Sequence, residues 1–210
     1  MKLQIAAKLL KIAKAKQRFI IVYGGRGSGK SYGLASLCLA KALEGQKIGA
    51  FREFQNSIDD SIHSLLASQI ETLGLEDFEV QNNQILFNGD VAFKFRGMAR
   101  NIEGIKSMYG FNLFYIDEAQ TISFESLKAL TPTLREAGSQ IWMSGNPRSS
   151  TDAFSERFIK PFEKHIMRDG FYEDDMHLII RMNYEDNPWF NQTPLEQERI
   201  HDYKNLPRAM

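Results

Sequence analysis

The sequence predicts an α/β fold with a mostly parallel sheet flanked by helices, and three observations carry this prediction. The apolar run FIIVY leads into GGRGSGKS at residues 24–31 and then into a helical stretch. The apolar run FNLFYI ends in the acidic pair Asp117-Glu118, and the run QIWMS ends in Gly145-Asn146-Pro147. Apolar strands that end in polar loops and alternate with helical segments are typical of parallel sheets covered on both faces.

The other elements follow from apolar spacing and turn residues. Strands are expected at 19–23, 47–53, 78–80, 84–87, 91–95, 111–116, 140–144 and 177–182. Helices are expected at 31–43, 58–73, 124–135, 155–162 and 193–203. Asparagine-rich turns make the strands between 78 and 95 antiparallel, and Pro132 interrupts the helix that contains it. The more polar end of the chain predicts a core at 1–150 and a small lid or linker subdomain at 151–210.

Composition narrows the class of protein. With 210 residues, 43% hydrophobic and 25% charged, the chain is sized for one large domain with a small appendage. The lone cysteine, Cys38, excludes an internal disulfide framework and indicates a reducing cytoplasm. No apolar run is long enough to span a membrane. The zero net charge argues against a dedicated nucleic-acid-binding domain.

The lysine-rich stretch at 1–17 has two interpretations. Leu3, Ala6, Leu10 and Ala13 share one helical face, as in a targeting or membrane-surface helix. The alternative, which we favour, is a helix that packs on the edge of the domain, because the stretch lacks the serine and arginine of transit peptides.

The run GGRGSGKS fits the phosphate-loop pattern G-x-x-x-x-G-K-[ST] in the strand–loop–helix context that the pattern requires. Its glycines let successive backbone amides turn inward around phosphate oxygens at a helix N-terminus. Lys30 brings a cation to the β- and γ-phosphates, and the Ser31 hydroxyl is suited to Mg²⁺. The predicted nucleotide-binding residues are Gly24, Gly25, Arg26, Gly27, Ser28, Gly29, Lys30, Ser31 and Tyr32.

A carboxylate at the end of a neighbouring strand would lie beside this loop. Asp117 is expected to hold Mg²⁺ and Glu118 to polarise the water that attacks the γ-phosphate. The distance in sequence between Lys30 and Asp117 leaves room for an added strand, which predicts the additional-strand catalytic-glutamate class of P-loop NTPases. Asn146 is either a hydrogen-bond donor to the γ-phosphate or the lytic water, or part of an ordinary turn.

Taken in order, GGRGSGKS, FREFQNSIDDSI, IKSMYG, FYIDEAQ, SGNP and NYEDNPWF resemble the ATPase half of the phage terminase large subunit, the DNA-packaging motor. The resemblance implies ATP and Mg²⁺ as cofactors, translocation of double-stranded DNA into a procapsid, and host cytoplasm as the location. It also implies a portal protein and a small terminase subunit as partners, with a homo-oligomeric ring in the assembled motor or a monomer for the isolated domain. The family's nuclease half is expected to be absent from this chain.

The resemblance assigns further roles. Arg26 becomes an arginine finger in cis, or else a solvated loop residue, and Arg18 an adenine-side residue. Arg52 helps on the adenine side or pairs with Glu53. Two arginines in the loop before IKSMYG, Arg96 and Arg100, either complete a neighbouring subunit's site or are solvated. Trp189 and Phe190 are expected to pin the small subdomain to the core, and the rival interpretations are a helicase-type ATPase and a nucleotide-gated assembly module.

Overall fold

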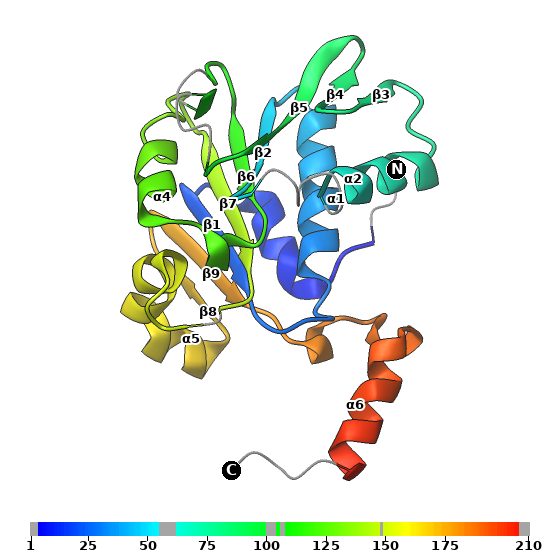
Figure 1. Cartoon of the computed structure of the whole chain (residues 1–210), viewed down its shortest axis with the longest axis vertical. Helices are drawn as coiled ribbons and strands as arrows, with labels where there is room; N and C mark the ends of the chain where they lie inside the picture. Colours follow the sequence, from blue (N-terminus) through cyan, green and yellow to red (C-terminus); the bar gives the residue numbers. More distant parts are fainter. Residues whose placement is uncertain (1–3, 55–61, 100–103, 106–107, 148, 206–210) are drawn as a thin grey trace.

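The computed structural model describes residues 4–54, 62–99, 104–105, 108–147 and 149–205. A nine-stranded sheet forms its centre, with the order β3-β4-β5-β2-β6-β7-β1-β9-β8 (Figure 1). The strands are β1 (Phe19–Tyr23), β2 (Ile48–Arg52), β3 (Phe78–Gln81), β4 (Gln84–Phe87), β5 (Asp90–Gly97), β6 (Leu113–Ile116), β7 (Gln140–Gly145), β8 (Phe171–Glu173) and β9 (His177–Arg181).

Six neighbouring strands, from β5 to β9 in the sheet order, run parallel. The antiparallel strands lie at the edges, with β3 and β4 on one side and β8 on the other. Strand β7 lies between β1, which leads into the glycine-rich loop, and β6, which leads into Asp117. This inserted strand confirms the predicted additional-strand arrangement.

Side chains that alternate along β1 divide between two apolar cores. Ile20 and Val22 belong to the core that also holds residues of α1 (Lys30–Leu43), α2 (Ser64–Thr72) and the 3₁₀ helix η1 (Ala7–Lys14). Ile21 belongs to the opposite core, with α4 (Phe124–Leu130), η5 (Ser155–Ile159) and α5 (Glu163–Asp169). Burial on both faces explains why the parallel strands read as continuous apolar runs.

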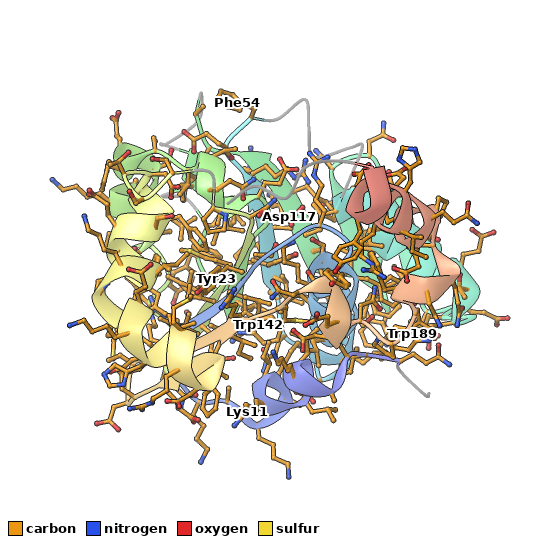
Figure 2. All side chains as sticks on the ribbon, turned by 90° about the horizontal axis from the view of Figure 1, so that it is seen from below. Lys11, Tyr23, Phe54, Asp117, Trp142 and Trp189 are labelled. Carbon is orange, nitrogen blue, oxygen red and sulfur yellow. The ribbon has the colours of Figure 1, made fainter. Side chains whose placement is uncertain are left out.

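The N-terminal stretch packs on the domain. Leu9 and Ile12 of η1 are fully buried, whereas Lys11 projects outward from this helix (Figure 2). Phe54 lies at the opposite rim of the molecule and Trp142 in its interior. None of the helices in the described ranges is long and apolar enough to cross a membrane.

The structure differs from the expected division at residue 150. Strand β9 pairs along its whole length with β1, and β8 pairs with β9, so the sheet continues well past that position. Helix α5 and strand β8 were not predicted. Beyond β9 come short 3₁₀ turns, η7 (Tyr184–Asp186) and η8 (Phe190–Gln192), and then α6 (Pro194–Asn205), which extends away from the sheet (Figure 1).

Two helices are shorter than predicted. Helix α4 ends at Leu130, just before Pro132, whose ring cannot continue the hydrogen-bond pattern. Its N-cap is Ser123, whose hydroxyl accepts a hydrogen bond from the amide of Ser126. Helix α2 begins at Ser64, and residues 58–61 of the helix expected at 58–73 lie outside the described residues.

Candidate functional site

The carboxyl ends of four adjacent parallel strands meet at one edge of the sheet and carry the predicted site. Strand β1 leads into the glycine-rich loop, β2 ends at Arg52, β6 leads into Asp117, and β7 contains Ser144. A cavity of about 350 Å³ opens there, lined by Arg26, Gly27, Ser28, Gly29, Lys30, Ser31, Tyr32, Arg52, Asp117, Glu118, Gln120, Ser144, Gly145 and Asn146. Ligands of parallel α/β sheets bind at this edge.

Glycine is required at specific points of the loop. Gly27 and Gly29 have φ angles of +74° and +76°, in the left-handed region that residues with a Cβ rarely adopt. At Gly24 a Cβ would collide with the carbonyl of Met182, which follows β9. The loop therefore has its shape because backbone from a distant part of the chain lies directly against it.

The residues present fit a bound phosphate. The hydroxyl of Ser28 is buried, and the structure shows no hydrogen-bond partner for it among the described residues. Lys30 is the first residue of α1, and its Nζ donates to the carbonyl of Gly25 at 3.1 Å. Burial lowers the pKa of Lys30, while Asp117 raises it. A phosphate in the loop would accept from both side chains and favour the charged lysine.

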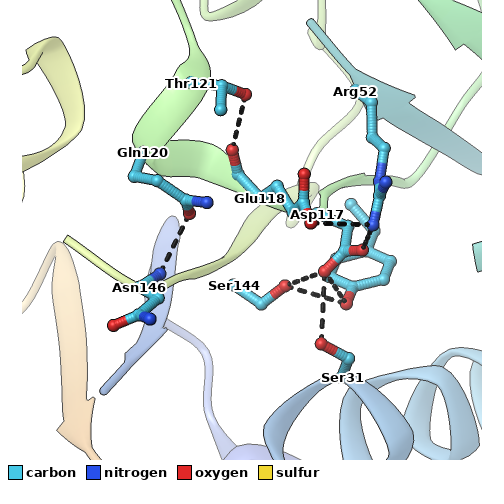
Figure 3. A network of polar contacts seen from close by, with 9 residues as sticks. Ser31, Arg52, Asp117, Glu118, Gln120, Thr121, Ser144 and Asn146 are labelled. Atoms are coloured by element: carbon cyan, nitrogen blue, oxygen red, sulfur yellow. Dashed lines mark hydrogen bonds and ion pairs between the residues drawn. The ribbon is translucent and has the colours of Figure 1, made fainter. Parts of the chain in front are cut away.

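Asp117 is the centre of a buried polar network (Figure 3). Its Oδ1 accepts hydrogen bonds from Ser144 at 2.5 Å and from Ser31 at 3.3 Å. The phenol of Tyr115 donates to the same oxygen at 3.3 Å and lies 3.0 Å from Ser144 Oγ. The adjacent Ser31 hydroxyl and Asp117 carboxylate are hard oxygen ligands of the kind Mg²⁺ prefers, so the predicted metal ligands are brought together.

Arg52 occupies a different place from the one expected. Its guanidinium forms an ion pair with Asp117 at 2.6 Å and approaches Glu118 at 3.5 Å. An adenine-side position or a pair with Glu53 was expected, whereas the structure places the guanidinium at Asp117, and Oε1 of Glu53 accepts from Ser126. Strand β2 lies next to β6, and this adjacency brings Arg52 to the acidic pair.

Glu118 sits in an unusual backbone conformation. Its φ of +53° places a residue with a full side chain in the left-handed region. Both the amide and the hydroxyl of Thr121 donate to the Glu118 carbonyl, at 2.9 and 2.8 Å, and hold the turn (Figure 3). About half of the Glu118 side chain is exposed, at the mouth of the cavity. Strain of this kind is common where a side chain must be aimed at a reacting group.

Asn146 lies on the cavity wall, where its backbone amide donates to Gln120 Oε1 at 2.9 Å. This bond ties the end of β7 to the turn after Asp117. Neither Gln120 nor Tyr115 was identified as a site residue from the sequence. Gln120 is only the residue that follows FYIDEA, and Tyr115 has the pattern of an aromatic residue in the core. Ser144 is buried against Asp117.

Arg18 precedes β1, at the opposite end of the strand from the glycine-rich loop, so the predicted adenine-side role is wrong. Its guanidinium donates to the carbonyls of Thr131, Leu134 and Ser139 and to the Ser139 hydroxyl. Because Arg18 precedes β1 whereas the loop follows it, the strand separates the two. Arg18 instead donates to carbonyls of the segment that connects α4 to β7.

A second cavity, of about 310 Å³, adjoins the loop on the side of η1. It is lined by Gln4, Ile5, Ala6, Gly29, Tyr32, Gly33, Asn187 and Trp189. Tyr32 and Gly29 border both cavities. Phe190, which was expected to pin the C-terminal segment to the core, is buried against Gly27. No local sequence pattern indicated that the N-terminal segment would reach this position.

Of the three other arginines with predicted roles, the structure describes Arg26 and Arg96. Arg26 is exposed on the wall of the first cavity, so its assignment as a finger in cis stays a prediction. Arg96 lies within β5, paired in register with Phe51. Arg100 lies outside the described residues, as does most of the QNSIDDSI run.

Comparison with known proteins agrees with this geometry. The family model described as "Phage terminase large subunit" matches residues 16–208. The PBSX phage terminase large subunit of Bacillus subtilis (strain 168) is 27% identical over 155 residues, covering 71% of this chain and 36% of that protein.

Solved structures show the same fold. The large terminase of a thermophilic bacteriophage superposes with a TM-score of 0.73 at 16% identity, covering 95% of this chain and 50% of that one. The same terminase has also been solved with ADP and with ATP-γ-S. The N-terminal domain of the bacteriophage phi29 DNA packaging ATPase has a TM-score of 0.67 at 14% identity, covering 85% and 97%. The chain thus spans about a third to a half of the full-length terminases, and it belongs to the phage terminase large subunit family.

Proposed function

We propose that this chain hydrolyses ATP with Mg²⁺ and is the motor part of a terminase that packages double-stranded DNA. The observation that carries the proposal is the meeting of the glycine-rich loop, Ser31 and Asp117 in one cavity. A phosphate binder alone needs no buried carboxylate beside the loop hydroxyl, whereas a Mg²⁺-dependent hydrolase does.

Each side chain then has a role that follows from its place. The loop amides and Lys30 bind the β- and γ-phosphates, and Ser31 and Asp117 would hold Mg²⁺, which supplies charge neutralisation on the phosphate oxygens. Glu118 orients and polarises the attacking water from the mouth of the cavity. Arg26 stabilises the charge that develops on the transferred group.

We assign the nucleobase to the second cavity. This cavity is mainly apolar, shares Gly29 and Tyr32 with the phosphate cavity, and lies at the start of α1. Pockets that take a planar ring are largely apolar with few polar groups. Gln4 and Tyr32 supply polar groups on its wall, whereas both ends of the Asn187 amide are engaged by Gly27 and Trp189. None of the arginines expected from the sequence is among the lining residues.

The proposed partners follow from the family and are those of a packaging motor: double-stranded DNA, a portal protein and a small terminase subunit. A homo-oligomeric ring in the host cytoplasm is part of the same proposal. The phi29 neighbour, described as a DNA packaging ATPase, supports it through a shared fold.

The test is steady-state ATP turnover with Mg²⁺ for the wild type, Glu118→Gln and the control Glu125→Gln, an exposed residue on α4. Glu118→Gln should bind ATP normally and lose about 10²–10⁴ in turnover, the usual contribution of a general base. Glu125→Gln should behave as the wild type. Equal turnover in all three proteins would contradict the role of Glu118, and a single burst with very slow release in the wild type would favour an assembly module.

Turnover measured against protein concentration addresses the ring. Specific activity that rises with concentration, and falls in Arg100→Ala, would mean that sites are completed between subunits. Constant specific activity in both proteins would mean a self-contained site, and Arg26 would then be the finger.

A further inference from the structure

The segment that follows β9 lies directly against the phosphate loop. The amide of Met182 donates to the carbonyl of Tyr23 at 2.8 Å, which extends the pairing of β9 and β1 to the first residue before the loop. Four residues further on, Asp186 forms an ion pair with Lys8 of η1 at 2.9 Å. Its carboxylate also accepts from the amide of Asn183 at 2.9 Å. The segment is therefore anchored before it reaches the loop.

Asn187 makes the contact with the loop. Its Nδ2 donates to the carbonyl of Gly27 at 2.7 Å, and its Oδ1 accepts from the amide of Trp189 at 3.1 Å. The two bonds fix the orientation of the side-chain amide, because a flipped amide would place oxygen against oxygen and nitrogen against an N–H. One end of the amide is held by its own segment, and the other end holds the loop.

The carbonyl that Asn187 contacts belongs to the Gly27–Ser28 peptide, and the orientation of this peptide decides where the Ser28 amide points. In a trans peptide the C=O and the following N–H point to opposite sides. Anchoring the Gly27 carbonyl toward Asn187 therefore turns the amide of Ser28 away from Asn187. Gly27 and Gly29 both have left-handed backbone angles with many alternatives open to them, so the loop needs an external constraint to keep one shape.

Aromatic packing closes the same side. A Cβ on Gly27 would come within 2.5 Å of Phe190 Cε2 and 3.2 Å of Leu195 in α6. The ring of Tyr184 contacts Phe190 with centroids 4.9 Å apart. The Asn187 hydrogen bond is part-buried and lies beside these apolar contacts, which lower its exposure to water.

We propose that Asn187 is a positioning residue of the phosphate loop, whose side-chain amide holds the Gly27–Ser28 peptide in the orientation that binds phosphate. The inference rests on the proposed nucleotide-binding function. Within the described part of the chain, the side-chain bonds of Asn187 go to Gly27 and Trp189 and not to Asp117 or Glu118, so it acts on binding rather than on the chemical step.

The experiment compares wild type, Asn187→Ala, Asn187→Asp and the control Asn191→Ala, an exposed residue in the same segment. The readouts are the Kd of a fluorescent ATP analogue, kcat at saturating ATP, Tm, and amide exchange of residues 25–30 without nucleotide. Asn187→Asp keeps the size and the acceptor for Trp189 while losing the donor to Gly27, so it decides the matter if the alanine variant does not fold.

Asn187→Ala should weaken nucleotide binding about tenfold, the net value of one hydrogen bond. Asn187→Asp should weaken binding at least as much, because it also places a carboxylate against the Gly27 carbonyl. Loop amides should exchange faster, while kcat and the Tm relative to Asn191→Ala stay close to wild type. The KM-against-kcat split separates positioning from a general loss of structure. Unchanged Kd and unchanged exchange in both variants, with normal wild-type binding, would overturn this inference alone. A wild type that binds no nucleotide would overturn the proposed function and the inference together.

Discussion

The ion pair between Arg52 and Asp117 allows a quantitative prediction, because both partners are buried. Their side chains are 9% and 7% exposed, and the N–O distance is 2.6 Å. Replacing Arg52 by Met keeps the apolar stem and leaves the carboxylate of Asp117 buried without its cation. Breaking such a pair typically costs about 3–5 kcal/mol. Three hydroxyls still donate to Asp117 Oδ1, so we expect the lower end, about 3 kcal/mol.

The assay is thermal and urea unfolding without nucleotide or metal. For a chain of this size 1 kcal/mol corresponds to roughly 2–4 °C, so Arg52→Met should lower Tm by about 6–12 °C. The matched control is Arg26→Met, an arginine of the same cavity that is exposed and should shift the free energy of unfolding by less than about 0.5 kcal/mol.

A second substitution separates the lost cation from the lost packing. If the cost lies in the uncompensated charge, adding Asp117→Asn to Arg52→Met should restore part of the stability, since a buried pair replaced by neutral groups is often tolerated. The double variant should then be more stable than Arg52→Met alone. Equal stability of Arg52→Met and Arg26→Met, or a further loss on adding Asp117→Asn, would refute this reasoning.

Three further predictions address the loop and its surroundings. Arg18→Met should lower the free energy of unfolding by about 2 kcal/mol, because the carbonyls of Thr131 and Leu134 lose their donor. Urea unfolding measures this loss, and a fluorescent ATP-analogue titration should give an unchanged nucleotide Kd. Gly27→Ala should weaken nucleotide binding by at least about tenfold, because its Cβ meets the ring of Phe190 at a left-handed backbone position; wild-type affinity would contradict the described packing. Because burial lowers the pKa of Lys30, the cation is lost as pH rises through that lowered value. Nucleotide affinity should therefore begin to fall at a lower pH than it would with an unburied lysine, and binding in that range should take up a proton. Calorimetry in two buffers of different ionisation enthalpy measures that uptake, and proton release would contradict it.

The centre of the parallel sheet could be predicted because β1, β2, β6 and β7 are buried on both faces and therefore read as largely apolar runs. The residue that follows each run reaches the site, so Asp117 and Asn146 were found from local sequence together with the loop. The same logic accounts for the error at Arg18, since a residue that precedes a strand lies at the opposite edge of the sheet from one that follows it.

Which strands lie next to each other in the sheet could not be predicted from local sequence. The pair of Arg52 and Asp117 depends on β2 lying beside β6, and the inclusion of β8 and β9 depends on β9 pairing with β1 across more than 150 residues of sequence. Long-range pairing leaves no local pattern, so 177–182 was recognised as a strand and placed in a separate subdomain. Asn187 was missed for the same reason, because its partner, Gly27, is 160 residues away.

The charged side chains of the cavity determine where an incoming triphosphate is attracted and where it is repelled. Among the lining residues, the cations are Arg26, Lys30 and Arg52, and the carboxylates are Asp117 and Glu118. Arg52 lies between the two carboxylates, whereas Lys30 donates to the neutral carbonyl of Gly25 in the loop. An incoming triphosphate is attracted toward the loop, where amides and Lys30 face it, and repelled by the acidic end unless a divalent cation lies between them. Arg52 limits that repulsion by engaging Asp117, so its removal should both destabilise the protein and make nucleotide binding depend more strongly on Mg²⁺.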